Sequence, residues 1–374
     1  MEPEVTTLKQ AISLQTKKIS QEIAYSKPTL SKNELKSVLE CMIQDEISFG
    51  NVAIRYEKEL ASAFEYKYAL TTSSISAAYH LAFLSFSVDE KSEIILASNT
   101  SVSALDAIGY LKANPVIVDI APSSFHPSDE KIIEKINENT KVLILSYAYG
   151  SYRNYDKLKA FIKEKYEYIK IIEDISYIAG AENDEVLVGS LADIAIIGLH
   201  EDMLMTIGKG AAVLTNSQNI YSVIKDLRMH GGKKPYKIRY DYTITDYQAA
   251  MGLEQLSQLT NIINRRRKIG QLFKETLLSS IFETWFQYPN IDTFGAFPVI
   301  CKQALEKSES FFKNKNIECR YTLMYGPLHR LTNKSASEFS NTEKLYQRGI
   351  LLPLYPNLTK LNIERIITAI RSFH

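Results

Sequence analysis

The sequence predicts an α/β fold, in which a mostly parallel sheet forms the centre of a large domain and a smaller α+β domain follows. Two observations carry this prediction. Short apolar runs of four to six residues recur along the chain, and helical stretches separate them. The runs are rich in β-branched residues, and such alternation is typical of parallel sheets covered by helices. The expected strands lie at residues 94–97, 116–120, 142–146, 169–172, 194–199 and 211–215.

The C-terminal third has a different pattern. It predicts a helix over residues 246–259, a long helical stretch over 265–278, a strand at 294–300 and a final helix at 363–372. We therefore expect a large domain at residues 24–255 and a small α+β domain at residues 256–374.

Residues 1–23 form a separate N-terminal extension in this interpretation. Leu8, Ile12, Ile19 and Ile23 are scattered apolar positions that are compatible with a helix. The pattern fits a helix that docks on the protein or on another subunit, and it fits a frayed tail equally well. The extension has no continuous apolar region, so it is not expected to be a secretory signal.

The composition excludes several classes of protein. The chain has 374 residues, 45% of them hydrophobic and 23% charged, with 44 basic and 43 acidic residues and a net charge of +1. This balance argues against a nucleic-acid or membrane-surface binder. The basic run at residues 265–268 lies in a helical pattern and is expected to be a solvated helix face. No apolar run approaches the roughly 20 residues of a membrane span.

The three cysteines, Cys41, Cys301 and Cys319, lie far apart in the chain. Their spacing indicates neither a metal site nor a disulfide framework, so we expect no metal and a reducing compartment, the cytoplasm.

One segment concentrates polar groups at strand ends. The strand at residues 169–172 continues into Glu173 and Asp174, and the strand at residues 194–199 leads to His200. A Gly-Lys-Gly turn at residues 208–210 then enters the next strand. In this interpretation, these residues outline one site.

Further motifs occur in a recognisable order over some 350 residues, and together they resemble the DegT/StrS-type sugar aminotransferases. These motifs are Ser26-Lys27-Pro28, Ser48-Phe49-Gly50, the stretch at residues 74–82, Asn114-Pro115-Val116, Tyr149-Gly150, Arg228-Met229-His230-Gly231, the stretch at residues 248–256, Pro327-Leu328-His329 and Leu352-Pro353-Leu354-Tyr355-Pro356. The resemblance implies the three-layer large domain of fold-type I enzymes that use pyridoxal phosphate (PLP), a homodimer, and a nucleotide-linked keto-sugar as substrate.

The resemblance also implies roles for individual residues. Asp174 matches the carboxylate that holds the pyridine nitrogen, and Ser74 and Ser76 match a serine/threonine loop that binds the cofactor phosphate at a helix N-terminus. The lysine that forms the imine, three residues after a frequent histidine, falls on Met203. A thioether cannot form an imine or carry a proton.

Other cofactor positions depart from the family pattern as well. Ser101 stands where an aromatic ring stacks on the cofactor, Tyr177 where a glutamine or histidine covers the ring oxygen, and Gly198 where a serine binds the phosphate. Ile75 replaces a glycine in the serine loop. Asp241 replaces an asparagine that a neighbouring subunit gives to the phosphate. Two unit charges 4 Å apart repel by about 4 kcal/mol at an effective dielectric of about 20, so an ionised Asp241 disfavours a phosphate.

Two substitutes for the missing lysine can be considered. Lys209 lies six residues past Met203, in the Gly-Lys-Gly turn, and an exposed turn lysine is the expected reading. His200 could act as a proton carrier for pyridoxamine phosphate (PMP), as in the branch of the family that dehydrates sugars with histidine in place of lysine. His200 also fits a packing or substrate-side residue.

We therefore expect a divergent family member that forms no covalent link to PLP, does not transaminate, and binds a nucleotide-sugar or a partner subunit. Whether it is an enzyme stays open. The alternatives are an enzyme that uses PLP or PMP non-covalently with His200, and an interaction subunit that forms a heterodimer with a lysine-bearing paralogue. Tyr321, Tyr325 and His329 fall in the segment that the resemblance places beside the substrate, and packing roles fit them equally well.

Overall fold

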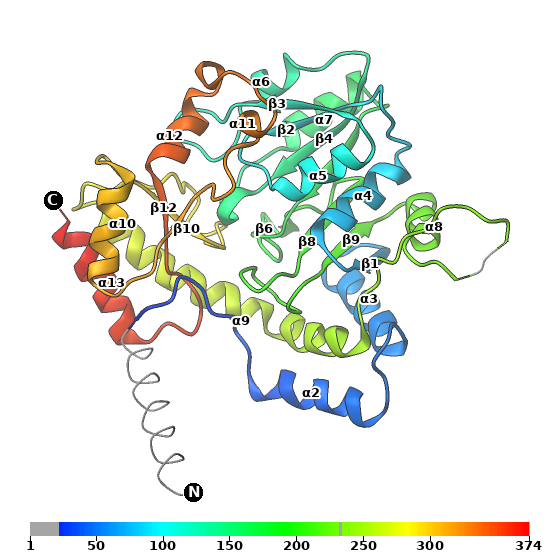
Figure 1. The fold of residues 1–374 in the computed structure, drawn as a ribbon, viewed down its shortest axis with the longest axis horizontal. Helices are drawn as coiled ribbons and strands as arrows, with labels where there is room; N and C mark the ends of the chain where they lie inside the picture. Colours follow the sequence, from blue (N-terminus) through cyan, green and yellow to red (C-terminus); the bar gives the residue numbers. More distant parts are fainter. Residues whose placement is uncertain (1–21, 232–233, 374) are drawn as a thin grey trace, which may run out of the picture.

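A seven-stranded sheet forms the centre of the molecule (Figure 1). Its strands, in spatial order, are β1 (Tyr68–Thr72), β9 (Ala211–Thr215), β8 (Ile194–Gly198), β5 (Lys170–Asp174), β4 (Thr140–Ser146), β2 (Glu93–Ala97) and β3 (Asn114–Val118). The pairs from β8 to β3 are parallel, and β9 runs antiparallel to both of its neighbours. The predicted mostly parallel sheet is confirmed, and each of the six expected strands overlaps one of these strands.

Helices cover both faces of the sheet, which gives three layers. One face packs against α4 (Ile75–Ser85), α5 (Val102–Tyr110) and α8 (Gln218–Leu227), and the other against α3 (Asn51–Ala63), α7 (Asp156–Lys165) and part of α9 (Asp246–Leu277). Side chains along β2 alternate between the layers: Ile94 and Leu96 join one core, and Ile95 joins the other. This period of two explains why short, wholly apolar runs form buried strands here.

A smaller antiparallel sheet with its own core follows. It consists of β10 (Phe297–Ile300), β12 (Gly349–Leu352) and β11 (Arg320–Tyr321), with β12 in the middle. The helices of this part are α10 (Leu305–Asn314), α11 (Leu328–Leu331), α12 (Ser340–Arg348) and α13 (Lys360–Ser372). Its core draws on β10, β12 and α13, and it also includes Ile23 and Tyr25 from the beginning of the chain.

One helix replaces the two that the sequence suggested. We expected helices at residues 246–259 and 265–278, but α9 runs unbroken for 32 residues. A capping box between Thr245 and Gln248 fixes its start, and no proline or glycine pair interrupts it. Leu259 and Ile263 pack in a core of the large sheet, whereas Ile269 and Phe273 pack in the core of the small sheet. The boundary that we placed between residues 255 and 256 therefore falls inside a continuous helix.

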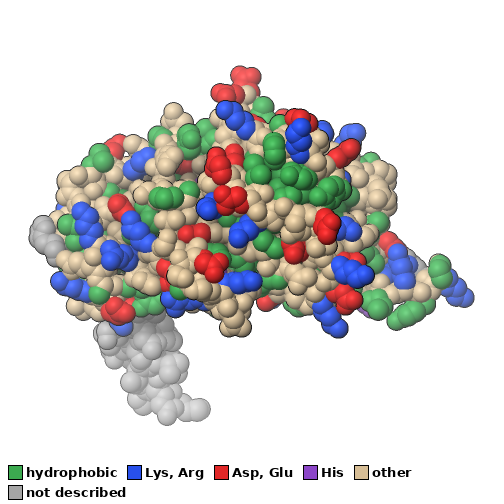
Figure 2. All heavy atoms as spheres, turned by 90° about the horizontal axis from the view of Figure 1, so that it is seen from above, with side chains coloured by type: hydrophobic (Ala, Val, Ile, Leu, Met, Phe, Trp, Pro, Cys, Tyr) green, Lys and Arg blue, Asp and Glu red, His purple; other side chains and the backbone are tan. Residues whose placement is uncertain are grey.

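The computed structural model describes residues 22–231 and 234–373. The expected N-terminal helix at residues 1–23 lies almost wholly outside this range; of it, Ile23 pairs with Ile317 in an isolated parallel bridge. Within the described residues, no helix has the length and apolarity that crossing a membrane requires. On the face shown in Figure 2, basic and acidic side chains are interspersed, which agrees with the balanced charge of the sequence.

Candidate functional site

A cavity of about 240 Å³ lies where the parallel strands end. The loops after β2, β4, β5 and β8 line it on one side, and the segment from β11 to Gly326 lines it on the other. Ligands of open α/β sheets bind outside the carboxyl ends of the strands, so this is the expected place for a site. The lining residues are 99–102, 146–149, 174, 176–177, 202–203 and 320–326, together with Tyr25, Ile75 and Leu351.

Asp174 ends β5 inside this cavity, and protein donors already hold both of its carboxylate oxygens. Oδ1 accepts hydrogen bonds from the Ser176 backbone N–H (3.0 Å) and the Ser176 hydroxyl (2.5 Å). Oδ2 accepts one from the Tyr79 hydroxyl at 2.7 Å. An ionised carboxylate has about four acceptor positions, so Oδ2 keeps about one position for a ligand.

Met203 lines the same cavity, so the fold brings it together with Asp174. It lies in a turn in which its N–H donates to the His200 carbonyl at 3.2 Å, and its side chain packs on the core that contains α4 and α5. None of the described residues that line the cavity is a lysine. Lys209 is exposed and stands outside the lining, in the turn before β9.

His200 is not brought into the cavity. Its side chain is half-buried and does not belong to the lining residues. Its Nε2 atom is buried and has no hydrogen-bond partner among the described residues. Burial lowers the pKa of His200, which favours the neutral imidazole at neutral pH.

The serine loop caps a helix and stands outside the cavity. The Ser74 hydroxyl accepts a hydrogen bond from the Ala77 N–H at 3.1 Å and caps α4, as expected of an N-cap serine. Neither Ser74 nor Ser76 lines the cavity, whereas Ile75 does. A Cβ atom built on Gly198 would lie 2.7 Å from Cδ1 of Ile75, so the branched side chain takes the space that a serine at residue 198 would need.

Ser101 and Tyr177 line the cavity, and Asp241 does not. The Ser101 hydroxyl accepts a hydrogen bond from the Ser103 N–H at 3.2 Å and caps α5, so no ring stands at this position. Burial, and then the charge of Asp202, raise the pKa of Tyr177, so its phenol is neutral at neutral pH. Asp241 is exposed.

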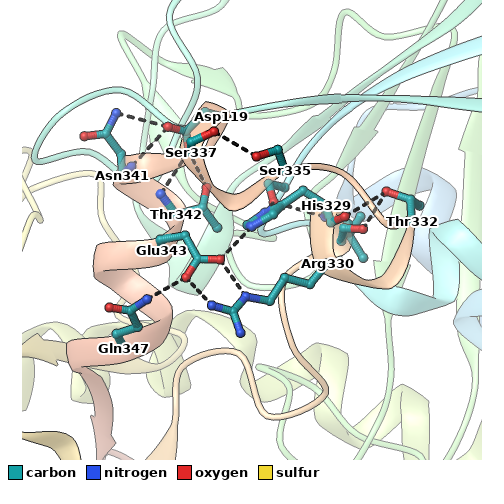
Figure 3. Close-up of polar contacts among 12 residues, drawn as sticks. Asp119, His329, Arg330, Thr332, Ser335, Ser337, Asn341, Thr342, Glu343 and Gln347 are labelled. Carbon is teal, nitrogen blue, oxygen red and sulfur yellow. Dashed lines mark hydrogen bonds and ion pairs between the residues drawn. The ribbon is translucent and has the colours of Figure 1, made fainter.

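The three residues expected beside the substrate separate into two groups. Tyr321 and Tyr325 line the cavity and are 37% and 73% exposed. His329 is fully buried and does not reach the cavity, so the expectation that it lies at the cleft mouth does not agree with the structure. Its Nδ1 contacts the Ser98 hydroxyl at 2.6 Å and its Nε2 contacts Oε1 of Glu343 at 2.8 Å. Figure 3 shows His329 inside this polar cluster between α11 and α12, which explains its burial.

Several residues of the site were not identified from the sequence, among them Tyr25, Tyr79, Asp202 and Arg320. Asp202 could have been found, because it directly precedes Met203. Tyr79 lies four residues after Ile75 on the same face of α4. Tyr25 and Arg320 reach the cavity only through the tertiary fold, so no local sequence pattern indicates them. The Arg320 guanidinium lies 4.6 Å from the centre of the Tyr25 ring.

Residues 28–371 match the profile of the DegT/DnrJ/EryC1/StrS aminotransferase family. The chain belongs to this family. It is similar to the GDP-perosamine synthase of Escherichia coli O157:H7, with 27% identity over 357 residues that cover 93% of this chain and 97% of that protein. It is also 25% identical over 375 residues to the uncharacterized protein MJ1066 of Methanocaldococcus jannaschii, which covers 92% of this chain and 96% of that protein.

Solved structures of other family members share the fold. The PLP form of the putative sugar aminotransferase Spr1654 from Streptococcus pneumoniae has a TM-score of 0.86 at 20% identity, covering 94% of this chain and 98% of that one. A GDP-4-keto-6-deoxymannose-3-dehydratase with bound GDP-perosamine has a TM-score of 0.81 at 18% identity, covering 93% and 100%. These likenesses confirm the fold class.

The residues of this family member do not fit PLP. The charged groups among the described lining residues are Asp174, Asp202 and Arg320, which leaves the lining one negative charge in excess. Met203 supplies no amine, and Ile75 fills the space beside Gly198. Of the groups that the cofactor would require, Asp174 alone is in place, and three protein hydrogen bonds occupy it.

Proposed function

We propose that this chain does not transaminate and that its cavity binds a sugar-containing ligand, such as a nucleotide-sugar, without a covalently held cofactor. The observation that carries the proposal is Met203, which lines the cavity together with Asp174 and falls on the position that the family resemblance gives to the imine-forming lysine. The similarity to GDP-perosamine synthases and to a dehydratase solved with GDP-perosamine supports a nucleotide-sugar as the ligand.

The test measures covalent attachment directly. Purified protein is incubated with pyridoxal phosphate, reduced with borohydride and digested, and the peptides are weighed by mass spectrometry. We expect no stoichiometric label on any single side chain, because no lysine lines the cavity in the described residues. The Spr1654 protein, solved in a PLP form, is the positive control. Stoichiometric labelling of one residue, Lys209 included, would contradict the proposal.

A second candidate function keeps a non-covalent cofactor with His200 as the proton carrier. One observation favours it: Nε2 of His200 is buried without a hydrogen-bond partner among the described residues, so it has an unused position. Against it stands the position of His200 outside the cavity lining. Equilibrium dialysis of PMP tests this second function: saturable binding that His200→Asn weakens would support it, and absence of saturable binding would exclude it.

We also propose that the chain works as an assembly of two subunits, either with itself or with a lysine-bearing paralogue. The outer side of α2 (Lys32–Ile43) supports this proposal, because Leu35, Leu39 and Ile43 are 70%, 53% and 72% exposed there. Leu35, Leu39 and Ile43 share one stripe because their spacing is helical, and contiguous exposed apolar surface of this kind marks interaction sites. In Figure 1, α2 lies at the edge of the molecule, below α9.

A further inference from the structure

The strand β3 is the last strand on one side of the large sheet, and no strand of the described residues pairs with its outer edge. Its ladder with β2 fixes which backbone groups face outward. The Asn114 N–H donates to the Ser92 carbonyl at 2.9 Å, and the Val118 carbonyl accepts from the Ser98 N–H at 2.8 Å. Successive residues of a strand alternate in direction, so the even-numbered residues of β3 face β2 and the odd-numbered ones face outward.

The outward row consists of the Pro115 carbonyl, the N–H and carbonyl of Ile117 and, one residue past the strand, the Asp119 N–H. None of these groups forms a hydrogen bond with a described residue. Backbone polar groups of folded proteins are almost always paired, so this row is open to a partner. Pro115 has no N–H, as is typical of edge strands, and pairing can therefore start only at its carbonyl.

A groove of about 620 Å³ follows this edge. Residues 115–122 line it along one side, α6 (Asp129–Ile133) with the turn after it forms one wall, and the segment at residues 334–341 forms the other. Ile132 of α6 packs in the core on one face of the sheet, and Phe339 packs in the core on the opposite face. The edge of β3 is thus recessed between two walls. The groove shares no lining residue with the cavity at the strand ends.

The shape of the groove selects the kind of partner. A row of backbone donors and acceptors is suited to an extended peptide that adds a strand to the sheet. Neighbouring strands lie about 4.8 Å apart. In a second copy of this chain the same edge lies between the same two walls, which would collide before the two strands came so close. The groove therefore fits one extended peptide segment and not a second copy.

Three of the charged groups that line the groove are already used within the protein. The Asp119 carboxylate accepts hydrogen bonds from the backbone N–H groups of Asn341 at 3.1 Å and Thr342 at 2.9 Å. Nζ of Lys131 lies 3.1 Å from Oε2 of Glu134, so these two charges offset each other.

The other three charged groups are Lys135 on one wall and Lys334 and Glu338 on the other. Their side chains are exposed and make no hydrogen bond or ion pair with a described residue. The unused charge of the groove is therefore positive by one, with an unpaired lysine on each wall. A carboxylate side chain complements such a pair of lysines.

We infer that an extended segment of a partner protein, carrying at least one carboxylate side chain, docks beside β3 as an eighth strand of the large sheet and that Lys135 and Lys334 contact its acidic side chains. The inference does not depend on the proposed function, because the groove and the cavity are separate.

The experiment measures whether a strand forms on β3. The full chain is mixed with blocked hexapeptides of sequence ETVTVE, QTVTVQ or KTVTVK, and amide hydrogen exchange is followed by residue-resolved mass spectrometry. We expect saturating ETVTVE to slow exchange of the Ile117 amide by about tenfold. The Val116 amide, which faces β2, is the internal reference and should not change. QTVTVQ should bind about threefold to tenfold more weakly, and KTVTVK more weakly still.

A double variant tests the two lysines. Lys135→Glu combined with Lys334→Glu should reverse the order of the peptides, so that KTVTVK protects Ile117 better than ETVTVE. Both lysines are exposed, and the fold should not change. Lys58→Glu is the control, because Lys58 is exposed on α3, which contacts β1 at the opposite edge of the sheet. It should leave the order as it is.

The peptide backbone is tested with ETVTVE methylated on its four central amide nitrogens, which should give no protection of Ile117. Equal protection by this peptide would overturn the inference, because no ladder could form. Absence of protection by ETVTVE at about 10 mM would overturn it too, since such weak binding is of no use to a docking site. Protection of Ile117 in the chain alone, increasing with protein concentration, would show that a second copy fills the groove. A peptide order that the double variant does not reverse would contradict the role of the lysines.

Discussion

The Tyr79 hydroxyl donates a 2.7 Å hydrogen bond to Oδ2 of Asp174, and this contact ties α4 to the end of β5. Tyr79 is fully buried, and burial together with the Asp174 charge raises its pKa well above the ordinary value. The phenol is therefore a permanent donor. The Asp174 carboxylate, which PLP would need in this family, is thus held by hydrogen bonds within the protein.

The Tyr79–Asp174 contact predicts that removal of the Tyr79 hydroxyl lowers the stability of the folded protein. Tyr79→Phe should lower the free energy of unfolding by about 1–3 kcal/mol, because a buried carboxylate loses a donor. Urea denaturation measures this loss. Tyr56→Phe is the matched control: Tyr56 is equally buried, and its hydroxyl has no partner among the described residues. A loss for Tyr79→Phe no larger than that for Tyr56→Phe would show that the bond contributes nothing.

The contact between Ile75 and Gly198 predicts a compensating pair of substitutions. Gly198→Ser should destabilise the protein by about 1–3 kcal/mol, since its Cβ would lie 2.7 Å from Cδ1 of Ile75. Combining it with Ile75→Ala, which removes the obstructing atoms, should restore part of the loss. Chemical denaturation of the four proteins of this double-mutant cycle gives the coupling energy. Additive effects of the two substitutions would contradict the prediction.

The Glu343 cluster predicts a dependence of stability on pH. Hydrogen bonds from Arg330, and further ones from His329 and Gln347, lower the pKa of Glu343 from 4.5 to about 2 despite partial desolvation. A carboxyl group with a lowered pKa stabilises the folded state above its unfolded pKa. This contribution is lost as the pH falls through about 4.5 toward about 2.

Glu343→Gln should therefore be less stable than the original protein at pH 7, and the difference should shrink as the pH falls below about 4.5. Thermal unfolding at a series of pH values measures it. Glu338→Gln serves as the control, because Glu338 is exposed in the neighbouring turn. A difference that stays constant between pH 7 and pH 3 would contradict the assignment.

The exposed apolar side of α2 predicts that a charged residue introduced there weakens the association of subunits. Leu39→Glu should weaken subunit association by at least about tenfold, because a charged group would have to be buried in the interface. The monomer fold should be unaffected, since Leu39 is 53% exposed. Sedimentation velocity measures the change, with Leu361→Glu on α13, where the leucine is 65% exposed, as the control. Unchanged association would place the interface elsewhere.

The strands and the strand-end carboxylate were predictable because they depend on short-range patterns. Buried runs such as residues 211–215 have no competing helical period, and β9 has the predicted bounds. The break expected within α9 was wrong, because the polar stretch around Arg265 is compatible with a helix that crosses between two cores.

The parts of the site that escaped prediction depend on long-range contacts. Tyr25 and Arg320 are far apart in the chain and meet through the pairing of Ile23 with Ile317. His329 was expected near the substrate because of the segment of the sequence in which it lies, without knowledge of its hydrogen-bond partners. Its partners Ser98 and Glu343 come from other elements, so its burial could not be foreseen.

The long helix α9 has a consequence for how the molecule comes apart. Its first half is embedded in one hydrophobic core and its second half in another. If one core unfolds, the apolar side chains of its half of α9 become exposed to solvent while the other half of the helix stays packed. The two regions are therefore expected to unfold together in one cooperative transition. The cavity between them keeps its shape as long as α9 remains helical.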